Sequence, residues 1–82
     1  MSCSTYNTVN TNAAQYAANT SAVSDLLTAH GINPGANHHY NAAAGDYVMN
    51  VTVASDEVTA HCASNPGSTI DQGVVWSNFK TQ

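Results

Sequence analysis

Apolar residues recur at helical spacing in the N-terminal half of the chain. The series from Tyr16 through Val23 to Leu27 keeps the steps that place side chains on one face of an α-helix. Asn12, followed three residues later by Gln15, has the pattern of a capping box, in which two side chains satisfy N–H groups at a helix start. The sequence therefore predicts a long helix that begins just after Asn12.

The end of this helix carries a clear local signal. Gly31 suits the left-handed turn that closes a helix, Ile32 follows as a hydrophobic contact, and Pro34 cannot continue the helix. We therefore expect the helix to stop at Gly31. A shorter helix is expected before it, capped by Ser4 and carrying Tyr6 and Val9.

Apolar and polar positions alternate in the middle of the chain. From Asp46 to Val53 the pattern is typical of a β-strand. The preceding residues 33–45 are rich in Gly, Asn and Ala and are predicted to form a loop. Because a single strand has no ladder partner, residues 46–53 are predicted to be an extended packing segment. The alternative is a hairpin over residues 46–63.

The last part of the chain is predicted to be helical. Ser55 and the two acidic residues after it are typical of a helix start, since carboxylates favour the N-terminal end of the helix dipole. This helix should end before Asn65-Pro66-Gly67. Ser68, with Asp71 three residues later, then predicts the start of a final helix. The fold class is therefore all-α, in one domain spanning residues 1–82, with α+β as the alternative if the hairpin forms.

Two cysteines, Cys3 and Cys62, change the stability argument. A chain of 82 residues buries a small core and is only marginally stable by itself. In such a short, lightly charged chain we favour a disulfide between them, with two reduced, buried cysteines as the alternative. Closing a loop of this size contributes roughly 4 kcal/mol in the chain-entropy model.

Charge is scarce along the whole chain. Charged residues make up 7% of it, with one Lys, no Arg and a formal net charge of −4. Phosphate binding needs clustered basic residues, so this composition argues against nucleic acid as a partner. No apolar run approaches the roughly 18 residues of a membrane-spanning helix, so membrane insertion is not expected.

Two cysteine-centred motifs resemble the HdeA/HdeB family of bacterial periplasmic acid-stress chaperones. The sequence Cys3-Ser4-Thr5-Tyr6 is similar to the family's Cys-x-x-aromatic opening of the first helix. Residues 58–66, VTAHCASNP, are similar to its apolar-x-x-x-Cys-x-x-Asn-Pro segment. The order of the expected elements is similar over nearly the whole chain.

The resemblance implies a small helical protein with Cys3 and Cys62 bridged. It implies a periplasmic or secreted location after removal of a signal peptide, with Met1 as an added start, and a homodimer near neutral pH. Family members loosen in acid and hold unfolding client proteins in solution. The predicted function is therefore that of an acid-responsive holdase chaperone, and not of an enzyme.

The resemblance also indicates which apolar side chains acid would expose. At neutral pH we expect them in the core or a dimer interface, and in acid on a client-binding surface: Leu26, Leu27, Val74, Val75, Trp76 and Phe79. Family members are richly charged, whereas this chain has five carboxylates and four histidines. Full protonation of these groups takes the formal charge from −4 to +5, and self-repulsion could then loosen a small domain.

The histidines raise an alternative function. His38, His39 and Tyr40 could ligate a metal ion or haem, which would make the protein a small secreted binding module. Metal sites usually need three or four ligands at organised spacing, so we predict a solvated loop and no cofactor. His61 and Cys62 are adjacent in the chain and diverge by about 100° on a helix, which argues against a catalytic pair.

Overall fold

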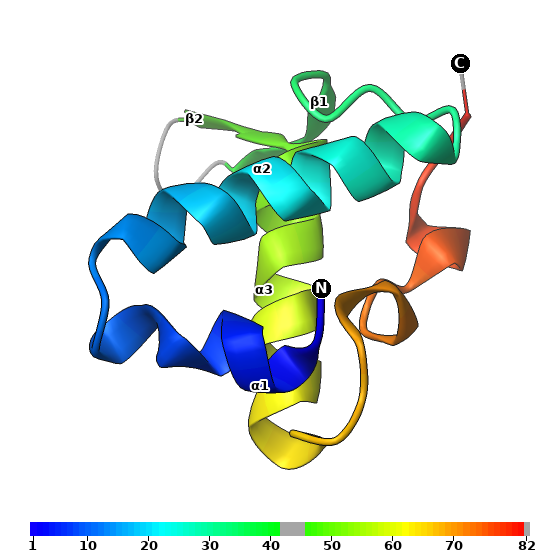
Figure 1. Cartoon of the computed structure of the whole chain (residues 1–82). Helices are drawn as coiled ribbons and strands as arrows, with labels where there is room; N and C mark the ends of the chain where they lie inside the picture. The colour runs from blue at the N-terminus through cyan, green and yellow to red at the C-terminus, as the bar shows by residue number, and fades with distance from the viewer. Residues whose placement is uncertain (42–45, 82) are drawn as a thin grey trace.

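Three α-helices, one two-stranded sheet and three 3-10 helices form the described part of the chain (Figure 1). The computed structural model describes residues 1–41 and 46–81. In order, the elements are α1 (Cys3–Tyr6), η1 (Asn7–Asn10), α2 (Ala14–Ala29), β1 (Asn37–Asn41), β2 (Asp46–Met49), α3 (Asn50–Ser64), η2 (Ile70–Gln72) and η3 (Trp76–Asn78). The predicted, mainly helical class is confirmed, and so is the disulfide between Cys3 and Cys62.

Helix α2 ends as the sequence predicts. Gly31 has a φ of +76°, in the left-handed region. Its N–H donates to the Thr28 carbonyl at 3.0 Å, and the N–H of Ile32 donates to the Leu27 carbonyl at 3.0 Å. These two bonds form a Schellman motif, and Ile32 is buried beside it. The predicted stop at Gly31 is confirmed.

The start of α2 matches the prediction in part. The Asn12 carboxamide oxygen accepts the N–H of Ala14 at 3.1 Å, so Asn12 does satisfy a donor of the first turn. The Gln15 side chain donates to the Asn19 carboxamide oxygen at 2.8 Å. Gln15 therefore ties together two turns of α2 and does not complete the predicted capping box.

Helix α1 begins earlier than predicted. Ser2 is its cap, and the Ser2 hydroxyl oxygen accepts the N–H of Thr5 at 3.2 Å. The Ser4 hydroxyl instead donates to the Pro66 carbonyl at 2.9 Å. The prediction of Ser4 as the cap was wrong because this side chain fastens α1 to the turn after α3.

A hairpin stands in place of the predicted loop before α3. Strands β1 and β2 pair antiparallel, with Asn37 opposite Met49 and a register shift next to Asn37. Residues 37–41 therefore form a strand and not a loop, while residues 42–45 lie outside the described part of the chain. The extended segment ends at Met49 instead of continuing to Val53. The alternative hairpin over 46–63 was also wrong, since residues 50–64 are helical.

Helix α3 begins at Asn50, five residues before the predicted start at Ser55. The N–H of Asn50 donates to the Ala36 carbonyl at 2.9 Å, and the N–H of Val51 donates to the Pro34 carbonyl at 2.9 Å. The turn before β1 thus satisfies the first N–H groups of α3. Since this capping comes from a distant segment, the alternating pattern of residues 46–53 could not reveal it.

The final helix predicted after Ser68 does not form. Thr69 is the residue that caps, with Gln72 as its capping-box partner, and η2 lasts a single turn. The chain then passes Gly73 and forms the equally short η3. The apolar residues after Gly73 therefore do not share one helix face.

The core lies where α2 crosses α3 and where the N-terminal residues meet the C-terminal half of α3 (Figure 1). Its largest fully buried side chains are Leu27, Val23, Val58, Cys3 and Cys62. Helix α3 presents Ala54, Val58 and Cys62 to this core at four-residue steps, which lie on one helix face. Among the described helices, none has both the length and the apolar character needed to cross a bilayer.

Candidate functional site

The six apolar residues predicted as a client-binding or dimer surface lie mostly in or against the core. Three of them are buried: Leu27, Val74 and Phe79. Two are partly buried and pack against the core: Leu26 and Trp76. Only Val75 is clearly exposed, at 45%. Client binding through these side chains would therefore require part of the fold to open.

Residues 70–81, here called the C-terminal segment, contribute several of these apolar side chains. The segment runs along one side of the molecule, in orange and red in Figure 1. It places Ile70, Val74 and Phe79 in the core. The Glu57 carboxylate on α3 holds its middle, accepting the N–H of Val75 at 2.9 Å and the side-chain amide of Asn78 at 2.8 Å. One carboxylate thus ties the segment to α3 at two points.

Two histidine rings pack on the aromatic residues of the C-terminal segment. The His30 ring, at the end of α2, is stacked on Trp76 with ring centroids 3.8 Å apart and planes inclined by 17°. The His38 ring, on β1, lies 5.2 Å from Phe79 in a tilted arrangement. Both aromatic side chains that anchor the segment therefore contact an ionisable ring.

A third histidine lies where the C-terminal segment begins. The Ser68 hydroxyl donates to the Gln72 side-chain oxygen, so the contact between His61 Nε2 and Ser68 Oγ, at 2.8 Å, has the imidazole as donor. Gly73 packs against the same histidine. A Cβ at Gly73 would lie 3.0 Å from the His61 Cβ and 3.1 Å from the Val58 Cα, so a larger residue would require these neighbours to move by a few tenths of an ångström.

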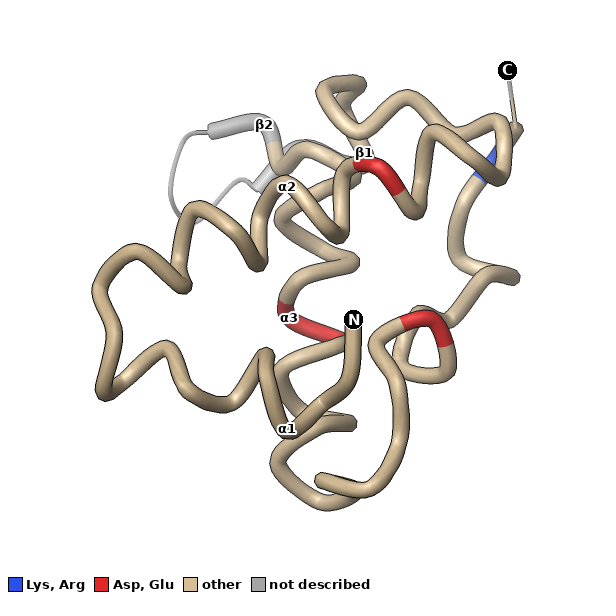
Figure 2. The backbone as a smooth tube through the Cα atoms, in the orientation of Figure 1, with Lys and Arg blue, Asp and Glu red and all other residues tan. Residues whose placement is uncertain are grey.

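Charged residues are few and unevenly placed (Figure 2). Lys80, the one Lys or Arg residue of the chain, lies in the C-terminal segment. It lines a cavity of about 340 Å³ together with His38 and Asn50. A protonated His38 would therefore share a cavity wall with a positive charge.

Among the acids whose side chains the structure describes, Asp71 is the one whose pKa the fold clearly shifts. The Thr69 hydroxyl donates to its carboxylate, and this bond lowers the pKa of Asp71 below its ordinary value of 3.8. Slight burial acts in the opposite direction, and the amino terminus lowers the pKa further. The start of the C-terminal segment thus includes a carboxylate that is stabilised in its charged form.

Of the three residues considered as alternative metal ligands, the structure describes the side chain of His38. His38 Nδ1 lies 2.9 Å from the Asn50 side-chain oxygen, and the Asn50 amide donates to the Asn33 carbonyl at 2.9 Å. His38 therefore helps fix the turn before α3. The side chains of His39 and Tyr40 lie outside the described residues. Within the described set, no three His, Cys, Asp or Glu side chains converge as metal ligands would.

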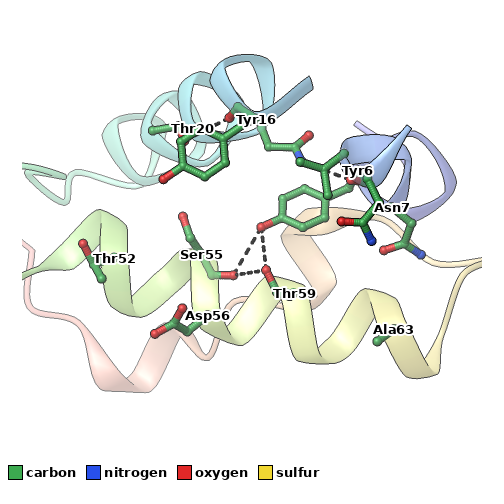
Figure 3. Close-up of a pocket in the computed structure, with 12 residues that line it drawn as sticks. Tyr6, Asn7, Tyr16, Thr20, Thr52, Ser55, Asp56, Thr59 and Ala63 are labelled. Carbon is green, nitrogen blue, oxygen red and sulfur yellow. Dashed lines mark hydrogen bonds between the residues drawn. The ribbon is translucent and has the colours of Figure 1, made fainter. Parts of the chain in front are cut away.

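A cavity of about 510 Å³ opens between α3 on one side and α1, η1 and α2 on the other, and it was not anticipated from the sequence (Figure 3). The buried Tyr6 and the exposed Tyr16 both line it. Its α3 wall consists of residues at helical spacing, from Thr52 through Asp56 to Ala63. That spacing was present in the sequence, but the identity of the opposing wall depends on how α2 crosses α3.

Comparisons with protein-family models, with curated protein sequences and with solved structures find no match to this chain. The resemblance to the HdeA/HdeB family therefore rests on the two cysteine-centred motifs and on the order of the elements as far as α3, because the final helix does not form.

Proposed function

We propose that this protein is an exported, acid-responsive holdase chaperone. Near neutral pH it is folded, and in acid it releases the C-terminal segment and offers apolar surface to unfolding client proteins. The observation that carries the proposal is the attachment of this segment through side chains that titrate: Glu57, His38 and His61, with His30 on Trp76. The disulfide supports export, because such bonds persist in oxidising compartments.

Acid weakens the attachment first at Glu57. As a carboxylate it accepts two hydrogen bonds from the segment, and bonds to a charged acceptor are stronger than neutral ones. Protonation removes the charge, so both bonds lose their charge-assisted part, and the oxygen that carries the proton becomes a poorer acceptor for its N–H partner.

The histidines act with opposite signs. A charged His38 would share a cavity wall with Lys80, and the repulsion between like charges would weaken the attachment. A charged His61 would lie close to Gly73 and α3, where burial disfavours the charge, so it would weaken the attachment as well. A charged His30, in contrast, is attracted by the face of Trp76. We infer that histidine protonation alone leaves the segment in place, and that opening follows the carboxylates, below about pH 5.

Release of the segment would uncover a continuous apolar surface. Val74 and Phe79 would leave the core, and neighbours such as Val58, Leu27 and Ile32 would lose their cover. The Cys3–Cys62 bond would still hold the N-terminal residues to α3. The opened state would therefore be compact, with exposed apolar side chains, as expected of a protein that binds unfolded chains.

The test combines structure and activity across pH 7 to 2. The Trp76 emission maximum and the binding of a hydrophobic dye should change together below about pH 5, with a fall in the sedimentation coefficient if a neutral-pH dimer dissociates. Over the same range the protein should suppress aggregation of an acid-labile client. Emission and dye binding that stay constant to pH 2, with no client protection, would end the proposal.

Glu57→Gln supplies a sharper version of the test. It removes the carboxylate that holds Val75 and Asn78, so opening and client protection should begin at higher pH than in the wild type. Asp25→Asn is the matched control, since it removes an exposed carboxylate of α2. If the two variants shift the opening equally, net charge controls it and Glu57 has no special role.

A further inference from the structure

The C-terminal segment is held by different contacts at its two ends. At its start, the N–H of Ile70 donates to the Met1 carbonyl at 3.1 Å, and Ile70 is only 3% exposed. Next to it, Thr69 forms an isolated antiparallel β-bridge with Ser2. Backbone groups and apolar side chains do not titrate in acid, so acid leaves this attachment to the N-terminal region unchanged.

Residues 74–81, here called the strap, have no such backbone attachment within the described part of the chain. Their two backbone–backbone hydrogen bonds, with N···O distances of 2.9 and 3.2 Å, lie within η3 and its flanking residues. The hydrogen bonds to α3 both end on the Glu57 carboxylate, which accepts the N–H of Val75 and the side-chain amide of Asn78. The strap is therefore a short peptide docked on the surface, with Gly73 at its base.

Three elements form the surface that the strap covers, here called the strap site. Val74 and Phe79 belong to the hydrophobic core, and they are 5% and 9% exposed. Between them, Trp76 stacks on the His30 ring at the end of α2, and the His38 ring of β1 contacts Phe79. Figure 1 shows this last part of the chain passing along one side of the molecule toward the end of α2. The strap site thus accepts two apolar side chains that are five positions apart.

We propose that the strap site is the client-binding site, and that the strap is an internal substitute for the client. This inference deepens the proposed function and rests on it. The partner that fits is a segment of an unfolded chain with two large apolar side chains five positions apart and one turn between them, as in the strap. Folded proteins bury most such side chains, so the strap site selects proteins that are unfolding.

The covalent link lets the strap exclude clients while its contacts are intact. A short tether gives an attached segment an effective concentration on the order of millimolar, so a client at a much lower concentration competes poorly. The strap must be weakened before a client replaces it, and loss of the Glu57 hydrogen bonds does this. The client then binds in the place of Val74 and Phe79, while the rest of the fold stays closed.

A disulfide that fixes the end of the strap tests the proposal in the full chain. A Cβ at Gly31 would lie 3.9 Å from the Thr81 Cβ, within the roughly 3.5–4.5 Å that is usual for disulfides. Gly31→Cys with Thr81→Cys should therefore join the strap to the end of α2. Gly31→Ser with Thr81→Ser is the matched control, since it replaces the same residues without a cross-link. At pH 2 the cross-linked variant should lose the client protection that the control retains.

Equal client protection by these two variants would overturn the inference. The acid-responsive chaperone would remain, with its client-binding site elsewhere. Absence of protection by the wild type would instead end the proposed function. The two failures are distinguishable because the strap site is also tested at pH 7, where no acid-induced opening is needed.

A fluorescently labelled peptide with the sequence of residues 74–81, VVWSNFKT, is the probe at pH 7. In the full-length variant Val74→Ser with Phe79→Ser, the strap loses the side chains that fill the site, so the peptide should bind. The wild type should bind it at least about tenfold more weakly, because its own strap competes. A control peptide with both apolar anchors replaced by Ser should bind the variant about tenfold more weakly, since less apolar surface is buried.

A milder variant, Phe79→Ser alone, keeps Val74 for the core and should bind the peptide with intermediate affinity. Far-UV circular dichroism verifies that each variant is helical, and fluorescence polarisation measures the binding. Equal affinity of the wild type and both variants, equal affinity of the two peptides, or no binding to a folded variant would overturn the inference.

Discussion

The N-terminal region (residues 1–10) and the C-terminal segment both pack against α3, but they are held by different kinds of bond. The N-terminal region is joined by the disulfide from Cys3 to Cys62. The C-terminal segment is held by the Glu57 carboxylate, by histidine rings and by buried apolar side chains. Acid should therefore act on one attachment and leave the other largely unchanged.

The bonds of the N-terminal region are mostly between groups that do not titrate in acid. The N–H of Cys3 donates to the Ser68 carbonyl at 2.9 Å, and the N–H of Ile70 donates to the Met1 carbonyl at 3.1 Å. The Asn7 side-chain amide donates to the Cys62 carbonyl at 3.0 Å. These bonds and the disulfide fasten the region both to the end of α3 and to the first residue of the C-terminal segment, through groups that do not titrate in acid.

The largest effect on stability is expected from removing the disulfide that holds the N-terminal region. The two cysteines are 59 residues apart, and opening a loop of this size should lower the free energy of unfolding by about 4 kcal/mol. Urea denaturation of oxidised protein and of Cys3→Ser with Cys62→Ser would measure it. Reduced wild type should match the double variant. A loss below about 1 kcal/mol would mean that the hydrogen bonds of the N-terminal region are sufficient.

A smaller effect is expected at the contact between the C-terminal segment and α3. Gly73→Ala would place a Cβ 3.1 Å from the Val58 Cα, so the segment must shift, at a cost of about 1–3 kcal/mol. The control is Gly67→Ala, because nothing lies within 4 Å of a Cβ at that position. Thermal unfolding followed by the Trp76 emission maximum should separate the two. Equal stability of both variants would contradict the close packing of Gly73.

The stack of His30 on Trp76 should give a pH-dependent coupling of about 0.5–1 kcal/mol, the range for an exposed cation–π contact. A double-mutant cycle with His30→Ala and Trp76→Leu measures this coupling without other contributions. It should be larger at pH 5 than at pH 8, because a positively charged ring is attracted by the face of an indole. A coupling that decreases at pH 5 would mean that the charged ring is expelled, and His30 would then assist opening.

The smallest effect is expected at Asp71. Because the pKa of this carboxyl is lowered in the folded protein, its contribution to stability is complete above the ordinary value of 3.8. It is lost as the pH falls through the lower, folded-state pKa. NMR titration should show a lower Asp71 pKa in the native protein than in urea, and Thr69→Ala should raise the native value. Identical values in the native and the urea-unfolded protein would contradict the role of the Thr69 hydroxyl.

The candidate site was only partly predictable from the sequence. Val74 and Phe79 were identified as apolar and placed in a core or interface, and they are buried. The predicted arrangement was wrong. A continuous helix was expected after Ser68, whereas the structure has two short 3-10 helices, η2 and η3, with residues 73–75 between them. The roles of Glu57 and His30 were missed, since their partners lie in a segment that is distant along the chain.

Some features needed no more than the sequence because their physical causes are local or unambiguous. The stop of α2 depends on Gly31, which tolerates a positive φ, and on hydrogen bonds between residues within one turn. The pairing of Cys3 with Cys62 follows from there being two cysteines, once a disulfide is expected at all.

The tertiary structure decided whatever depends on contact between distant residues. Helix α3 could start at Asn50 because the carbonyls of Pro34 and Ala36 satisfy its first N–H groups, a form of capping that no local pattern encodes. The two valines after Asn50 alternate as in a strand but are helical, since packing against α2 and the N-terminal region overrides a weak local preference. In the same way, the close approach of Gly73 to α3 sets the path of the C-terminal segment.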